Sequence, residues 1–205
     1  MVMPLFPAFL DIAGRDVLIV GGGTVAAAKI GRLLPFRPRL TVIARGVRPE
    51  IERWANEGRL RLERRPFHPG DTAGRFLVIV ATDDQALQAV VKRECEQSGI
   101  LCNVVDVPSL CDFVFPALIV KGDIVIGIST SGQGPAVAAA LRRWLERHLP
   151  ADLEERLRTV VEYRNRLPRG HVRQAKVIEL TRALFGEEDG DEGPGAHHDD
   201  DDEHR

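Results

Sequence analysis

Short apolar runs rich in β-branched residues alternate with amphipathic stretches over the first half of the chain. The apolar runs predict strands at 17–20, 40–44, 60–64, 76–81 and 100–105. Apolar residues at helical spacing lie between them, and predict helices at 24–34, 49–57 and 83–98. Strands that alternate with helices in this way favour a parallel sheet covered on both faces, so we predict an α/β fold.

The pattern changes after residue 113. Two apolar runs, 117–120 and 124–129, are joined by Lys-Gly-Asp and predict a β-hairpin. Because two strands alone are marginally stable in water, we expect the hairpin to pair with that of a second subunit, which makes the protein a homodimer. A helix follows, with Pro135 at its first position and Pro150 after its end. We assign residues 114–149 to this dimerisation region.

Two further amphipathic helical patterns predict a C-terminal helical domain over residues 150–186. Residues 187–205 hold ten of the 30 acidic residues and almost no apolar ones, which predicts disorder. The three histidines there lie among aspartates. We expect a solvated tail rather than a metal site.

Charge and composition narrow the possible ligands. Without the tail, the chain has 27 basic and 20 acidic residues, a net charge of +7 that suits an anionic ligand. The basic residues are not clustered enough to indicate nucleic acid, and no apolar run approaches the roughly 20 residues of a membrane span. The three cysteines have neither zinc nor CxxC spacing, so we expect reduced thiols in a cytoplasmic protein and no metal site in this part.

A glycine-rich turn connects the first predicted strand to the first helix. Residues 21–26, GGGTVA, fit the pattern G-x-G-x-x-A. Gly21 permits a tight turn, Gly23 lets the backbone approach a pyrophosphate, and Ala26 lets helix and strand pack closely. The helix N-terminus then offers free N–H groups to phosphates. With a strand before and a helix after, this motif predicts a Rossmann-like dinucleotide-binding domain over residues 1–113.

The second strand does not decide between NAD and NADP. The acidic residue that usually holds the ribose, about 20 residues beyond the glycines, is absent. Arg45 stands after the second strand instead. It is suited to the 2′-phosphate of NADP and equally to lying flat over the adenine, so both cofactors stay open.

Polar residues follow the next two predicted strands. Thr82 is placed to contact the nicotinamide side of a cofactor, whereas Asp83 suits either the site or the N-cap of the next helix. Asn103 and Asp106 come from the last strand. Asp106 is suited to accept a proton while a hydride leaves, or simply to form a turn before Pro108.

Residues 129–135, STSGQGP, join a strand to a helix and are rich in hydroxyl and N–H groups. They form either an anion cradle for the carboxylates of a second ligand or a packing turn.

These segments together resemble the precorrin-2 dehydrogenase family, which includes the N-terminal half of siroheme synthase. The matching stretches are LIVGGGTVAAAKI, LTVIA, ATDD, CNVVDVPSLCDFVFPALI and GISTSGQGPAVAAALR, which cover residues 4–150 in family order. The resemblance implies a Rossmann domain, a small dimerisation sheet and a C-terminal helical domain. Members usually carry Ser where this chain has Gly134, which removes one possible hydroxyl contact.

The resemblance also implies a reaction, the oxidation of precorrin-2 to sirohydrochlorin with NAD as hydride acceptor. The catalytic aspartate falls on Asp106. The implied cofactor contacts are Gly21, Gly22, Gly23, Thr24, Val25, Arg45, Gly46 and Thr82. Asn103, Ser129, Thr130 and Ser131 are expected to contact the anionic tetrapyrrole substrate. Two alternatives stay open: an enzyme that also inserts Fe(II) into sirohydrochlorin, and a non-enzymatic NAD-sensing regulatory domain.

Overall fold

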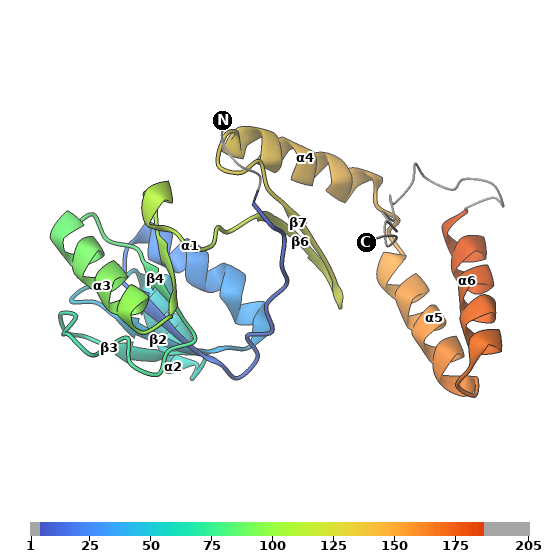
Figure 1. Ribbon diagram of the computed structural model, residues 1–205, viewed down its shortest axis with the longest axis horizontal. Helices are drawn as coiled ribbons and strands as arrows, with labels where there is room; N and C mark the ends of the chain where they lie inside the picture. Colours follow the sequence, from blue (N-terminus) through green and yellow to red (C-terminus); the bar gives the residue numbers. More distant parts are fainter. Residues whose placement is uncertain (1–4, 187–205) are drawn as a thin grey trace, which may run out of the picture. The chain divides into compact units, whose positions relative to one another are not determined.

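The computed structural model describes residues 5–186 (Figure 1). Its contacts divide the chain into two compact units. The first contains the chain up to Pro116 together with Ser129–Pro135, and the second contains Ala117–Ile128 and the helices from Ala136 onward. The predicted disordered tail, 187–205, lies outside the described residues. No helix within residues 5–186 has the length and apolar character needed to cross a membrane.

The first unit is a five-stranded parallel sheet in the order β3-β2-β1-β4-β5, flanked by helices. Its strands are β1 (Asp16–Val20), β2 (Arg39–Ile43), β3 (Arg61–Glu63), β4 (Leu77–Val80) and β5 (Leu101–Val104). Its helices are α1 (Thr24–Leu33), α2 (Pro49–Asn56), α3 (Gln85–Gln97) and the short 3₁₀ turns η1 (Leu34–Phe36) and η2 (Pro108–Leu110). The predicted α/β fold is therefore confirmed.

Helices cover both faces of the sheet because successive strand side chains point to opposite sides. On one face Ile19 and Ile79 pack in a buried cluster with Ile30 of α1 and Ile51 of α2. On the other face Leu18, Val78 and Cys102 are in a cluster with Val91 and Cys95 of α3. Strands buried on both sides have no polar alternation, which is why the sequence shows them as continuous apolar runs.

The second unit holds the predicted hairpin and three helices. Strands β6 (Ala117–Lys121) and β7 (Ile124–Ile128) pair antiparallel, with Lys121 opposite Ile124, so the turn consists of Gly122 and Asp123. Gly122 has a φ of +55°, which this tight turn requires. The helices are α4 (Pro135–His148), α5 (Leu153–Arg166) and α6 (His171–Phe185), and Pro135 occupies the first position of α4 as expected.

Helix α3 begins two residues later than its pattern indicates. Helix α3 starts at Gln85 because the side chain of Asp84 accepts a hydrogen bond from the Leu87 N–H at 3.0 Å. The capping role considered for Asp83 therefore belongs to Asp84. Asp83 stays exposed just beyond the end of β4.

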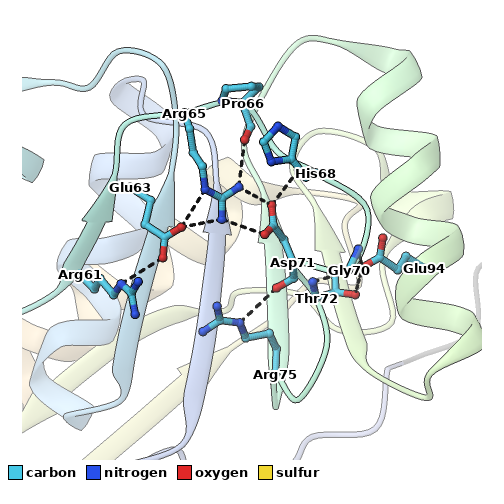
Figure 2. A network of polar contacts seen from close by, with 10 residues as sticks. All are labelled: Arg61, Glu63, Arg65, Pro66, His68, Gly70, Asp71, Thr72, Arg75 and Glu94. Carbon is cyan, nitrogen blue, oxygen red and sulfur yellow. Dashed lines mark hydrogen bonds and ion pairs between the residues drawn. The ribbon is translucent and has the colours of Figure 1, made fainter.

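A polar network fastens the long loop between β3 and β4 (Figure 2). The Arg65 guanidinium binds Glu63 of β3 at 2.5 Å and makes two bonds, of 2.7 and 2.8 Å, to the Asp71 carboxylate. Glu94 of α3 accepts hydrogen bonds from the Gly70 N–H at 3.0 Å and from the Thr72 hydroxyl. The loop is thus tied to the edge strand at one end and to α3 at the other.

This network predicts an acid-sensitive contribution to stability. The Arg65 hydrogen bonds hold the pKa of Asp71 below its ordinary 3.8. A lowered pKa in the folded state stabilises the fold above pH 3.8, and this stabilisation is lost as pH falls through the folded-state pKa. We expect Asp71→Asn to lower Tm at pH 7, with the difference from wild type shrinking below pH 3.8, by circular dichroism melting. Asp83→Asn, which changes an exposed carboxylate, should leave Tm unchanged at every pH.

Candidate active site

The first two glycines of the turn after β1 pack so closely against neighbouring loops that neither position has room for a side chain. Gly21 has a φ of +119°, and a methyl group there would overlap the carbonyl of Ala81, which follows β4. A methyl group on Gly22 would overlap the carbonyl of Gly46 and lie 2.7 Å from the Val47 side chain. The two glycines therefore bring the loops after β1, β2 and β4 together at one edge of the sheet.

Gly23 differs from its two neighbours because the space beside its backbone is open. Apart from atoms of the adjoining residues, no atom lies within 4 Å of the position that a methyl group on Gly23 would occupy. Gly23 is the N-cap of α1, no side chain caps the helix there, and the first turn contains no acidic residue. The N–H groups at the helix start, beside the exposed Thr24 and Val25, thus face open space and fit a diphosphate.

Backbone hydrogen bonds continue the sheet past the ends of its strands. The Gly22 carbonyl accepts the Arg48 N–H at 2.9 Å, and the Val20 carbonyl accepts the Ala81 N–H at 2.7 Å. Arg45 is exposed, and within residues 5–186 it forms no ion pair with a carboxylate. Its guanidinium is available to a ligand, in agreement with either cofactor considered from the sequence.

Thr82 is half-buried in the turn between β4 and α3. Its hydroxyl accepts the Asp84 N–H at 3.3 Å, and its carbonyl accepts a 2.7 Å hydrogen bond from the Gln88 side chain. These bonds fix the residue next to the Gly21–Ala81 contact. The hydroxyl keeps its own proton available for donation to a ligand.

Asp106 lies immediately beyond β5, exposed, at the same edge of the sheet. The Val105 N–H donates to the Val80 carbonyl at 2.9 Å, and the Val107 N–H donates to the Val104 carbonyl at 3.2 Å, which closes a tight turn. Within this turn Asp106 has a φ of +63°. Aspartate tolerates the left-handed region better than most residues, at a cost on the order of 1 kcal/mol. The turn thus holds one carboxylate out from the end of β5.

Asn103 anchors the segment that follows β5. Its side chain is buried, and its amide nitrogen donates to the Phe113 carbonyl at 2.8 Å and to the Cys111 sulfur at 3.4 Å. The Asn103 amide oxygen is also buried, and no donor among residues 5–186 reaches it. Burial raises the pKa of the Cys111 thiol, which donates to the Val104 carbonyl at 3.1 Å.

A second anchor lies on the other side of the same segment. The Asp112 carboxylate accepts the Cys102 N–H at 2.9 Å and pairs with the buried Lys92 ammonium at 2.6 Å. Burial acts to lower the pKa of Lys92, but the hydrogen bonds to Asp112 and Glu96 outweigh it and raise that pKa. Together the two anchors hold residues 111–113 along the edge strand, next to Asp106.

The hydroxyl-rich loop bonds largely to itself and to the N-terminal segment. The Ser129 hydroxyl accepts the Ser131 N–H at 3.1 Å, and the Thr130 hydroxyl accepts the Gly134 N–H at 3.1 Å. The Ser131 hydroxyl accepts the Leu5 N–H at 3.3 Å. Each oxygen still has a proton to donate, so the expected contact with an anionic ligand stays a prediction.

Lys29 is a residue near this site that the sequence motifs did not single out. It lies on α1, and its ammonium is 4.2 Å from the centre of the Phe115 ring. The sequence could have drawn attention to Lys29, because it is the one charged residue among the first seven of α1, TVAAAKI.

The parallel sheet, the open glycine turn and the uncapped helix start define a dinucleotide-binding domain of the Rossmann type. In agreement with this, a family described as "Putative NAD(P)-binding" matches residues 8–117. The solved structure of the precorrin-2 dehydrogenase SirC is 30% identical, with a TM-score of 0.74 over 86% of this chain and 89% of that one. The chain therefore belongs to the precorrin-2 dehydrogenase family of NAD(P)-binding proteins.

Curated relatives agree with this assignment. A siroheme synthase from Methylococcus capsulatus is 40% identical over 169 residues, which are 78% of this chain and 36% of that protein. Siroheme synthase 1 from Serratia proteamaculans is 40% identical over 151 residues, 74% of this chain and 32% of the relative. The chain thus spans about a third of the length of the curated relatives it matches.

The geometry of the glycine turn predicts opposite effects for two neighbouring substitutions. Gly22→Ala should lower Tm markedly, because its methyl group has no space, whereas Gly23→Ala should keep Tm within about 1 °C of wild type. Gly23→Ala should nevertheless weaken NAD binding at least about tenfold, because its methyl group occupies the surface offered to the diphosphate. Differential scanning fluorimetry and NAD titration calorimetry measure the two effects. Unchanged NAD affinity in Gly23→Ala would contradict the placement of the diphosphate.

Proposed function

We propose that the protein oxidises precorrin-2 to sirohydrochlorin with NAD as the hydride acceptor. The observation that carries the proposal is the carboxylate of Asp106, held out from β5 at the sheet edge where the open glycine turn lies. The precorrin-2 dehydrogenase name of its structural neighbour and the siroheme synthase names of its relatives support the same reaction.

In this proposal, different residues bind the cofactor and accept the proton. When bound, NAD supplies an acceptor for the two electrons and the hydrogen that leave precorrin-2 as a hydride. The α1 N-terminus would hold the diphosphate beside Gly23, and Thr82 would orient the nicotinamide end by donating its hydroxyl proton. Arg45 and Gly46 would hold the adenosine half. Asp106 accepts the proton that precorrin-2 loses together with the hydride, which balances the oxidation.

The substrate side of the proposal rests on charge. Precorrin-2 carries eight carboxylates, and residues 1–186 carry a net charge of +7. Ser129, Thr130 and Ser131 keep hydroxyl protons for carboxylates. Asn103 supports the site from behind, since its buried amide holds the segment that follows Asp106. We also propose a cytoplasmic location, and the three free cysteines suit it because reduced thiols are typical of that compartment.

The proposal predicts a specific kinetic defect for Asp106→Asn. The variant keeps the shape of the side chain but loses its basicity, so kcat should fall about 10²- to 10⁴-fold while NAD affinity stays within twofold. NADH formation and sirohydrochlorin absorbance, followed together with precorrin-2 and NAD supplied, give the rate. Asp123→Asn, at the hairpin turn, is the matched control and should retain full activity.

The same assay separates the alternatives. A fully active Asp106→Asn would remove the role given to this residue. Tight NAD binding without tetrapyrrole binding would favour a regulatory domain. Sirohydrochlorin supplied with Fe(II) and without NAD tests separately for metal insertion.

We further propose that the protein is a homodimer formed through its second unit. The hairpin β6–β7 is a two-stranded sheet, which is marginal without further pairing. Helix α4 carries an exposed apolar stripe at helical spacing, formed by Val137, Leu141 and Trp144, whose exposed fractions are 56%, 45% and 49%. A second copy that covers this stripe removes apolar surface from water.

This predicts that Leu141→Asp shifts the protein from dimer to monomer, because a carboxylate in an apolar interface is costly to desolvate. Multi-angle light scattering after size exclusion, over a range of concentrations, measures the mass. Arg143→Asp, on another face of the same helix, should stay dimeric. A monomeric wild type would overturn the proposal.

A further inference from the structure

Lys29 is held in a defined position rather than extending freely from the surface. It lies in the second turn of α1, and its ammonium is placed 4.2 Å from the centre of the Phe115 ring. Phe115 packs against Phe113 with ring centres 5.7 Å apart, and both rings contact the buried cluster between α1 and the sheet. The hydrogen bond from Asn103 to the Phe113 carbonyl fixes the segment that carries the rings.

The Lys29 ammonium is half-buried but not neutralised by contact. Within residues 5–186 no carboxylate oxygen lies within the 4.0 Å of an ion pair with it. Burial lowers the pKa of Lys29 from its ordinary 10.5, and Arg32 adds to this, whereas the charge of Asp106 acts in the opposite direction. The contrast with Lys92 is clear, since that buried lysine is paired with Asp112 at 2.6 Å. A half-buried cation without an ion-pair partner favours an anionic ligand.

The negative charge of Asp106 would repel an anionic substrate unless a cation beside it offsets the repulsion. Under the proposed function, a substrate with eight carboxylates must approach the negative charge of Asp106, and like charges repel. Asp106 is among the groups whose charge acts on Lys29, yet the two make no direct ion pair. The ammonium is therefore within range of the aspartate's charge but not paired with it, and it stays available to a third group.

We propose that Lys29 binds a carboxylate side arm of the tetrapyrrole and so places the macrocycle over Asp106. This inference rests on the proposed function for the identity of the ligand. The ring of Phe115 supports the ammonium from one side, and the bound carboxylate completes its coordination from the open side.

Three variants separate carboxylate binding from a structural role. Lys29→Met keeps the apolar stem against Phe115 and removes the charge, whereas Lys29→Arg keeps a cation over the ring. Arg93→Met is the matched control, because it removes one exposed positive charge from α3, on the opposite face of the sheet. The probe is uroporphyrin, an octacarboxylate porphyrin, titrated by fluorescence, together with steady-state kinetics on precorrin-2 and NAD.

We expect Lys29→Met to raise the uroporphyrin Kd and the KM for precorrin-2 by about 10- to 100-fold, the scale of a lost charge-assisted hydrogen bond. The NAD Kd and Tm should not change, and Lys29→Arg should restore most of the porphyrin affinity. Arg93→Met should behave as wild type.

The outcomes distinguish this inference from the proposed function. Unchanged uroporphyrin affinity in Lys29→Met would overturn the role of Lys29, even in an active enzyme. A fall in Tm with equal loss of NAD and porphyrin binding would also overturn it, since that is the result of a structural role. A wild type that binds uroporphyrin in a Lys29-dependent way but does not oxidise precorrin-2 would sink the proposed reaction and leave the carboxylate site standing.

Discussion

The close contact of backbone with backbone at Gly21 and Gly22 is the constraint on which the site depends. Each glycine lies where even a methyl group would overlap the carbonyl of a neighbouring loop, Ala81 in one case and Gly46 in the other. These contacts bring the ends of β1, β2 and β4 together. Gly23, which is free of such contacts, then presents the start of α1 to open space. One short turn therefore both assembles the edge of the sheet and leaves part of it accessible.

The substrate side of the site depends on the anchored segment that follows β5. The edge strand β5 is followed by a segment anchored through Asn103 and through the Lys92–Asp112 ion pair. Because this segment is fixed, Asp106 can be kept in a left-handed conformation, and Phe115 can be kept beside Lys29. The Asp106 carboxylate acts electrostatically on the half-buried Lys29 ammonium without pairing with it. This arrangement suits a polyanionic substrate, since the carboxylate can take a proton while the ammonium offsets charge repulsion.

Stability and function are separated within the first unit. The network around Arg65 and Asp71 ties down the loop between β3 and β4 through ion pairs and hydrogen bonds among its own residues. Polar groups with such partners have no need of a ligand. The exposed Arg45 and the half-buried Lys29, in contrast, form no ion pairs within residues 5–186, and they follow the turns that carry the proposed cofactor and substrate sites.

The sequence alone determined the order of strands and helices, the glycine turn and the place of Asp106 after the last strand. Apolar runs and glycine positions report local backbone preferences and burial, which do not depend on distant residues. Only the tertiary structure showed that Gly22 packs against Gly46, that Asp84 rather than Asp83 caps α3, and that Lys29 lies beside Phe115. The glycine and lysine contacts join residues far apart in the chain, up to 86 positions from Lys29 to Phe115. The cap depends on which of two adjacent aspartates can reach the Leu87 N–H, and the sequence shows only that both are present.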